Sequence, residues 1–177
     1  QQGRAGVVAA KESGAGAVFV VGLSRDRDRL EMARRFGADR VIDAEKEDPG
    51  QIISDHTQGA MAELTMDATG HPSGASLALS LAGTGATVIL PGLYGPTTEV
   101  PLLLDRAVLK ELTLKGVFSH DAPAVEAAIH VARQNKYPLV EMISHRFPLE
   151  KAEDAIKLVG GSVPGETPLK VVLDPAL

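Results

Sequence analysis

Residues 14–39 read GAGAVFVVGLSRDRDRLEMARRFGAD, and this stretch decides the fold. The run from Ala17 to Leu23 is short, apolar and rich in β-branched residues, which predicts a buried strand. A helix is predicted over residues 26–36, because apolar side chains recur on one side, and Gly37 ends it. A buried strand followed directly by an amphipathic helix is the repeating unit of α/β proteins.

The same alternation continues on both sides of this stretch. Further strands are predicted at 40–42, 62–69, 86–90 and 112–118, and helices at 3–14, 50–56, 72–82 and 122–134. The strands are nearly continuous apolar runs, so both faces of their sheet are expected to be covered. Strands that alternate with helices require crossover connections, and the sequence therefore predicts an α/β fold with a mostly parallel sheet.

The pattern changes after His120. The segments predicted there are a strand at 140–144, a helix at 149–159 and a strand at 169–173. The inner face of that helix is expected to carry Ile156 and Val159 together with Ala152 and Ala155. These segments form a small appendage, so we expect two domains, comprising residues 1–136 and 137–177.

Composition excludes several classes of protein. The 177 residues are 44% hydrophobic and 23% charged with a net charge of −5, and Lys and Arg are scattered, which argues against nucleic-acid binding. There is no cysteine, so neither a disulfide nor a thiolate metal site can form within the chain. No apolar run reaches the roughly 20 residues that cross a bilayer, and we expect a cytoplasmic protein.

The first residues, Gln1, Gln2 and Gly3, precede a helix of small residues. They fit the last positions of a G-x-G-x-x-G turn, in which the helix amides face a pyrophosphate and Gly3 is the third glycine. One glycine before a helix is common, so this match is weak by itself. In the strand order 3-2-1-4-5-6, the first strand precedes this turn and lies at the centre of the sheet. We therefore expect a sheet that lacks this strand, with the gap closed by rearrangement, by another segment or by a partner chain.

Six stretches carry a family resemblance. They are residues 14–39, DATGHP (67–72), GATVILPGLYG (85–95), LKELTLKGVFSHD (109–121), ISHRFPLEKAEDAIKLV (143–159) and LKVVLDP (169–175). In this order they resemble the zinc-type medium-chain alcohol and polyol dehydrogenases, most closely the sorbitol and threonine dehydrogenase branch. The resemblance implies a Rossmann-type, doubly wound nucleotide-binding domain, in which 137–177 is the return of the chain to the catalytic domain.

The resemblance also implies a set of cofactor contacts. Gly3 is placed at the pyrophosphate and Lys170 at a phosphate. The positions on the adenosine-ribose side are Ala68, Thr69 and Gly70, and those near the nicotinamide are Pro91, Gly92, Leu93, Val117 and Phe118. Each has a plain structural alternative, because a glycine can simply end a strand and a lysine can be solvated.

The choice between NAD and NADP depends on the end of the strand at 17–23. NAD enzymes carry an acidic residue there, about 20 residues after the glycine turn, to bind the ribose 2′-hydroxyl. Here Gly22 or Ser24 takes that position, which departs from the sorbitol dehydrogenase pattern. Ser24 and Arg25 could donate to a 2′-phosphate, so the sequence favours NADP over NAD. In the alternative, the arginines pair with Asp26 and Asp28 on a solvated helix start.

The resemblance implies that a zinc ion polarises an alcohol or carbonyl oxygen in the intact protein while hydride moves to or from the nicotinamide. Its ligands would lie on a preceding catalytic domain, and we find neither catalytic residues nor metal ligands in this chain. The histidines have no metal-binding spacing; they are His56, His71, His120, His130 and His145. The isolated chain is therefore expected to be inactive, and its alcohol or carbonyl substrate cannot be read from the sequence.

Two alternatives stay open beside the zinc-dependent dehydrogenase. One is the zinc-free quinone-reductase branch, which shares the cofactor domain, and the other is a stand-alone nucleotide-binding module. The last strands, 112–118 preceded by 100–104, form a bare apolar edge that is expected to pair in a homodimer, as in the family. No membrane or nucleic-acid partner is expected.

Overall fold

The structure is a computed structural model and describes residues 2–177, so part of the expected glycine turn, Gln1, lies outside the described residues. The chain divides into two compact units, an N-terminal unit of residues 2–125 and a C-terminal unit of residues 126–177. The division falls inside helix α6 (Ala122–Arg133). The expected domains 1–136 and 137–177 remain a prediction, and each unit is described by itself.

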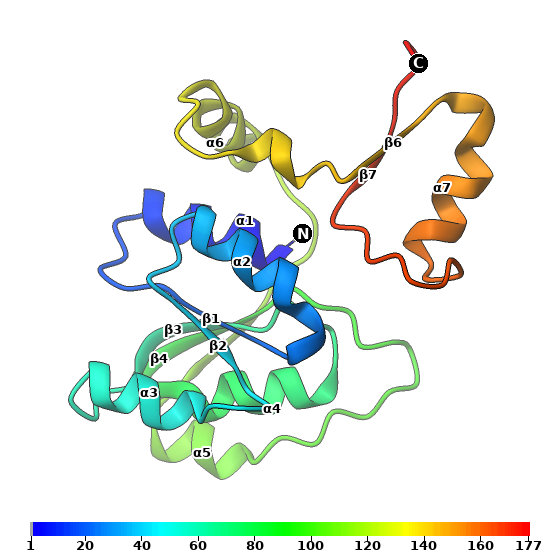
Figure 1. Cartoon of the computed structure of the whole chain (residues 1–177). Helices are drawn as coiled ribbons and strands as arrows, with labels where there is room; N and C mark the ends of the chain where they lie inside the picture. Colours follow the sequence, from blue (N-terminus) through cyan, green and yellow to red (C-terminus); the bar gives the residue numbers. More distant parts are fainter. Residues whose placement is uncertain (1) are drawn as a thin grey trace. The chain divides into compact units, whose positions relative to one another are not determined.

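The N-terminal unit contains five parallel strands in two sheets (Figure 1). The strands are β1 (Phe19–Gly22), β2 (Arg40–Asp43), β3 (Ala62–Met66), β4 (Ala82–Leu90) and β5 (Thr113–Gly116). One sheet pairs β1 with β2, and the other has the order β3-β4-β5. If β1 to β5 are strands 2 to 6 of the order 3-2-1-4-5-6, the two sheets are the halves on either side of strand 1. The Rossmann-type fold is thereby confirmed.

The central position between β1 and β3 is not filled by residues 2–177, in which no strand pairs with both sheets. Among the described residues the sheet has no strand at this central position, as the sequence predicts. Of the closures that the sequence left open, rearrangement into one continuous sheet does not occur among these residues. Each inner edge therefore presents backbone groups of the kind that a further strand would pair.

Local sequence signals account for the helices of this unit. The helices are α1 (Gln2–Glu12), α2 (Arg27–Arg35), α3 (Pro49–His56), α4 (Pro72–Leu81) and α5 (Leu104–Leu109), and a short 3-10 turn, η1 (Ser24–Asp26), precedes α2. Asp48 caps α3 by accepting hydrogen bonds from the amides of Gly50 and Gln51, just before a proline that suits the first turn. Gly37 takes a φ of +97° after α2, as a helix-ending glycine does. The helix α5 was not predicted.

The core of the unit lies between the sheets and these helices. Helix α2 packs on β1 and β2, and α4 packs on β3 and β4. Phe36 and Ile42 are fully buried in the first group, and Leu79 and Val88 are almost fully buried in the second. The alternation of apolar strands and amphipathic helices thus gives each of the two sheets a face that is covered by a helix.

Helix α1 contacts both halves. Gly6 faces the side chain of Met66 in β3, where a Cβ at position 6 would collide with the Met66 methyl group. Near the end of α1, Lys11 Nζ lies 2.6 Å from Asp39 Oδ2, and the amide of Val18, just before β1, donates to the same oxygen at 2.6 Å. The Lys11 ammonium is the main reason that the pKa of Asp39 is held below its usual range.

The C-terminal unit is built around a pair of short parallel strands, β6 (His145–Phe147) and β7 (Val171–Leu173). The 3-10 turn η3 (Leu149–Lys151) leads into helix α7 (Ala152–Val159), which packs on β7. Ser144 joins the two chain segments, because its hydroxyl oxygen accepts the amides of Leu169 and Lys170.

Two predictions for this unit were wrong. The strand expected at 140–144 is a 3-10 turn, η2 (Leu139–Met142), and the strand lies further along at β6. The turn forms because the amide of Glu141 bonds back to the carbonyl of Pro138, and pairing with β7 then fixes the strand. In α7, Ala155 and Leu158 are buried whereas Ile156 and Val159 are exposed. Within residues 126–177, α7 packs on β7 and on η3, and only the narrow side of the helix that carries Ala155 and Leu158 is buried.

We predict that Asp39→Asn destabilises the chain by about 1 kcal/mol or less at pH 7, because the ion pair with Lys11 is partly exposed and screened by water. The lowered pKa of folded Asp39 means that this stabilisation is present above the unfolded-state pKa and is lost as the pH falls through the folded-state pKa. Urea unfolding at pH 7 and at acid pH measures the difference, which should vanish in acid. Glu31→Gln, in an exposed pair within α2, is the control. A difference that persists in acid would contradict the assignment.

Candidate functional site

A cleft of about 370 Å³ opens at the carboxyl ends of the three-stranded sheet. Ligands of open parallel sheets bind outside these strand ends. The residues that line the cleft are Gln2, Ala68, Thr69, Gly70, Pro91, Gly92, Leu93, Phe118 and Ser119. They come from the first turn of α1 and from the segments that follow β3, β4 and β5, all within the N-terminal unit.

The structure brings together most of the predicted cofactor positions. Ala68, Thr69, Gly70, Pro91, Gly92, Leu93 and Phe118 all line the cleft. Gly3 lies just behind it, since a Cβ at this position would be 3.7 Å from the Cβ of Ala68. Val117 follows β5 but is outside the lining set.

Three predicted positions lie elsewhere. Ser24 and Arg25 lie in η1, directly after β1, and both are exposed. Lys170 belongs to the C-terminal unit, so its phosphate contact stays a prediction.

Two glycines let the walls of the cleft approach each other closely. Gly70 has a φ of +65°, in the left-handed region that favours glycine, and a Cβ there would lie 2.9 Å from the carbonyl oxygen of Leu93. A Cβ on Gly92 would lie 2.8 Å from the Cα of Gly70. The turn after β3 and the turn after β4 therefore touch through backbone atoms, and neither position has room for a side chain.

A buried carboxylate lies behind these turns. Asp67 is 2% exposed, and its Oδ1 accepts the amide of Thr69 at 2.9 Å and the hydroxyl of Thr69 at 2.6 Å. Its Oδ2 accepts the hydroxyl of Tyr94, from the turn after β4, at 2.5 Å. Burial, together with the hydrogen bond to Asp67, raises the pKa of Tyr94 well above its usual value, so the phenol keeps its proton. Gly74 of α4 leaves room for the side chains of Asp67 and Thr69, because a Cβ at position 74 would collide with both.

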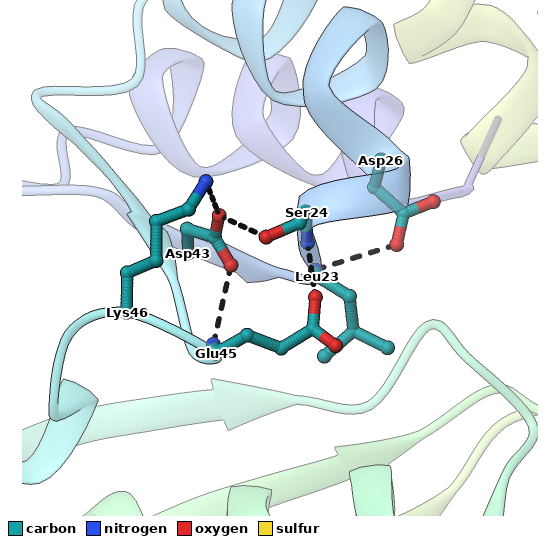
Figure 2. Close-up of polar contacts among 6 residues, drawn as sticks. All are labelled: Leu23, Ser24, Asp26, Asp43, Glu45 and Lys46. Atoms are coloured by element: carbon teal, nitrogen blue, oxygen red, sulfur yellow. Dashed lines mark hydrogen bonds and ion pairs between the residues drawn. The ribbon is translucent and has the colours of Figure 1, made fainter.

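The second polar cluster lies at the carboxyl ends of β1 and β2 (Figure 2). The hydroxyl of Ser24 donates to Asp43 Oδ2 at 2.6 Å, and the amide of Ser24 donates to Glu45 Oε2 at 2.7 Å. Lys46 Nζ lies 2.7 Å from the same Asp43 oxygen, and first this lysine and then Ser24 lower the pKa of Asp43. Asp26 Oδ2 accepts the amide of Leu23 at 3.4 Å. Ser24, which the sequence offered to a 2′-phosphate, thus already donates to two carboxylates, Asp43 and Glu45, and the first of these is also paired with Lys46.

Sequence reasoning missed several of these residues. Asp43 carried a signal, because it ends a strand whose parallel neighbour, β1, had already been placed at the cofactor edge. Asp67 also carried one, as a carboxylate inside the segment 62–69 that the sequence predicts to be a buried strand. Nothing in the sequence marked Tyr94, or Ser119, which has a left-handed φ of +62° without being glycine.

Within residues 2–177, no group of three or more His, Asp or Glu side chains is placed to hold a metal ion. No helix in the same part of the chain is long and apolar enough to cross a membrane.

We predict that Gly92→Ala destabilises the chain by about 1–3 kcal/mol, as overpacking does, because its Cβ meets backbone atoms of Gly70 that cannot rotate away. Gly116→Ala, in β5, is the matched control: a Cβ there meets nothing within 4 Å, and its effect should stay within about 0.5 kcal/mol. Urea unfolding of both variants measures the two changes. Equal stability of the two would show that the turns are not packed as described.

Comparison with known proteins is consistent with this geometry. A Mycobacterium tuberculosis protein named "Probable alcohol dehydrogenase adh" is 35% identical over 177 residues, which cover 98% of this chain and 48% of that protein. L-threonine 3-dehydrogenase of Bacillus subtilis is 31% identical over 165 residues, covering 91% of this chain and 45% of that protein. The crystal structure of an alcohol dehydrogenase from Thermotoga maritima matches with a TM-score of 0.85 at 30% identity, covering 96% of this chain and 46% of that one.

The chain spans about half the length of the curated relatives it matches. The family described as zinc-binding dehydrogenase matches residues 3–134, which include the whole cleft except Gln2. The expected resemblance to the zinc-type alcohol and polyol dehydrogenases is thereby confirmed. The chain belongs to the zinc-binding dehydrogenase family.

Proposed function

We propose that the N-terminal unit binds a nicotinamide dinucleotide, as the cofactor-binding part of a dehydrogenase that acts on an alcohol or polyol or on the corresponding carbonyl compound. The observation that carries this proposal is the cleft at the carboxyl ends of β3, β4 and β5, lined by two touching turns. When bound, the cofactor supplies hydride transfer. The residues of this chain bind and orient it.

The chemistry of the cleft fits such a cofactor. Helix α1 begins at Gln2, which lines the cleft, so the amides of its first turn are available to an anionic pyrophosphate. Gly3, next to Ala68, lets the helix lie close to the wall. The turn at 91–93 presents backbone groups, and Phe118 an apolar ring, to a nicotinamide. Val117 and Lys170 are further proposed contacts, which rest on the family resemblance.

The zinc ion that the family name implies does not fit the described residues, because residues 2–177 hold no suitable ligand group. We therefore assign no part in the reaction to a metal ion held by these residues. Residues 137–177 are proposed to belong to the catalytic domain, in keeping with their separate β6–β7 core.

For the adenosine ribose we propose NAD rather than the NADP that the sequence favours. The hydroxyl and amide of Ser24, which would serve a 2′-phosphate, already donate to Asp43 and Glu45. A 2′-phosphate carries a charge of about −1.5 to −2 and would be repelled by these carboxylates, as phosphoryl groups beside acidic residues are. A ribose 2′-hydroxyl can instead donate to a carboxylate, as in NAD-binding domains.

We predict that the chain binds NADH at least about tenfold more tightly than NADPH, a difference of about 1.4 kcal/mol. Glu45→Gln, which removes a nearby negative charge, should narrow that ratio by strengthening NADPH binding. Glu150→Gln, an exposed change of equal charge in the C-terminal unit, is the control. Fluorescence titration with NADH and with NADPH gives the two dissociation constants of the unsubstituted chain and of each variant. If the unsubstituted chain binds NADPH more tightly than NADH, the preference for NADP that the sequence favours is correct. If it binds neither cofactor, the proposed function is refuted.

We also propose a homodimer formed through β5, the last strand of its sheet. β5 has one neighbour in the order β3-β4-β5, and all four of its residues are exposed. Val117 and Phe118 directly after it are exposed as well. An edge strand with one neighbour, beside the exposed side chains of Leu114, Val117 and Phe118, is suited to pairing with a second copy across a two-fold axis.

Light scattering is predicted to give the mass of two chains for the unsubstituted protein. Leu114→Lys should give the mass of one, because it replaces an exposed apolar side chain of the edge strand with a charged one. Leu149→Lys, which introduces the same charge at an exposed leucine of the C-terminal unit, should leave the dimer intact. A single-chain mass for the unsubstituted protein at high concentration would contradict the dimer.

A further inference from the structure

The pairing of β3 with β4 ends just before the cleft. The ladder runs to Met66 opposite Ile89, and one more backbone bond, from the amide of Asp67 to the carbonyl of Ile89, closes it. Beyond this point the two segments leave the sheet as the turns that line the cleft. Something other than the sheet must therefore fix the distance between them.

The hydrogen bond between Tyr94 and Asp67 spans this gap. It joins residues 27 positions apart, one from each turn, at 2.5 Å. The contact of Gly92 with Gly70 limits how close the turns can come, because backbone atoms already touch there. The glycine contact is repulsive and the hydrogen bond attractive, so together they define one separation.

We propose that Asp67 and Tyr94 are positioning residues for the bound cofactor, because their hydrogen bond holds the turn at 67–70 and the turn at 91–94 at the separation that forms the cleft. This inference rests on the proposed function, since it assigns the pair a role in that site. Neither residue is among those that line the cleft, so the pair acts through Thr69, Gly70 and Leu93.

The surroundings of Asp67 support a fixed arrangement. The hydroxyl of Thr69 donates to Asp67 Oδ1, and the Thr69 hydroxyl oxygen accepts the amide of His71 at 3.0 Å. One chain of hydrogen bonds therefore orders the whole turn. With Tyr94 on Oδ2, both oxygens of the buried carboxylate have donors. Removing the Tyr94 hydroxyl would leave one oxygen without this donor in a place that water reaches poorly.

The tyrosine is suited to a permanent role rather than a switch. Burial and the neighbouring carboxylate raise the pKa of Tyr94, so its hydroxyl keeps its proton and remains a donor at neutral pH. Gly74, in the first turn of α4, leaves room for this carboxylate, because a side chain at position 74 would collide with Asp67 and Thr69.

Tyr94→Phe tests the proposal, with Tyr137→Phe as the matched control, because Tyr137 is the other tyrosine of the chain and lies in the C-terminal unit. Amide hydrogen exchange without ligand should become about tenfold faster in Tyr94→Phe at Thr69 and His71, whose amides donate to Asp67 Oδ1 and to the Thr69 hydroxyl oxygen. A tenfold change corresponds to about 1.4 kcal/mol, the scale of one hydrogen bond. Exchange at Val88, inside β4, should stay within about twofold of its original rate. NADH should bind about tenfold more weakly.

The control variant should change none of these quantities. Asp67→Asn serves as the conservative rescue: its amide can donate to the Tyr94 oxygen and its carbonyl can accept from Thr69, so its turn amides should exchange more slowly than those of Tyr94→Phe.

Uniformly faster exchange with unchanged NADH affinity would mean that the pair serves only global stability, and would overturn the proposal. Faster exchange of Asp67→Asn than of Tyr94→Phe would also overturn it. If the unsubstituted chain binds no dinucleotide, the proposed function fails, whereas the exchange rates still decide whether Tyr94 fixes the turns.

Discussion

The parallel pairing of β4 with both β3 and β5 is the constraint on which the cleft depends. The two ladders end at nearly the same level, at Ile89 and Leu90 of β4. Because all three strands run in one direction, the segments that follow them emerge at one edge and can converge on a single ligand. An antiparallel strand at either side would have carried its turn to the opposite edge.

Much of this arrangement could be predicted from the sequence, because the strands are apolar and glycine or proline marks the helix ends. The exceptions have physical causes. Helix α5 is short and keeps Val108 and Leu109 exposed, so no buried face is recorded in its sequence. The strand β6 is fixed by its pairing with β7, a contact between distant segments that no local pattern contains.

The candidate site divides in the same way. Gly70 and Gly92 could be predicted as site residues because a glycine that follows an apolar strand indicates a turn. The partners of Ser24 were not, because its contact with Asp43 follows from a register that sets Gly22 opposite Asp43. The reading of Ser24 as a free donor was reasonable for one strand taken alone. The neighbouring strand supplies the negative charge on which the proposed preference for NAD rests.

The two polar clusters lie on different sheets, and this makes helix α1 central to the proposed cofactor binding. A dinucleotide that reaches both Ser24 and the cleft must span β1 and β3, which no strand of residues 2–177 joins by hydrogen bonds. Helix α1 contacts both sides, through Gly6 against β3 and through Lys11 and Asp39 near β1. Its first turn also reaches the cleft. The helix that is proposed to hold the pyrophosphate thus also connects the two halves, so the proposed cofactor would bind to the same helix that links the two sheets.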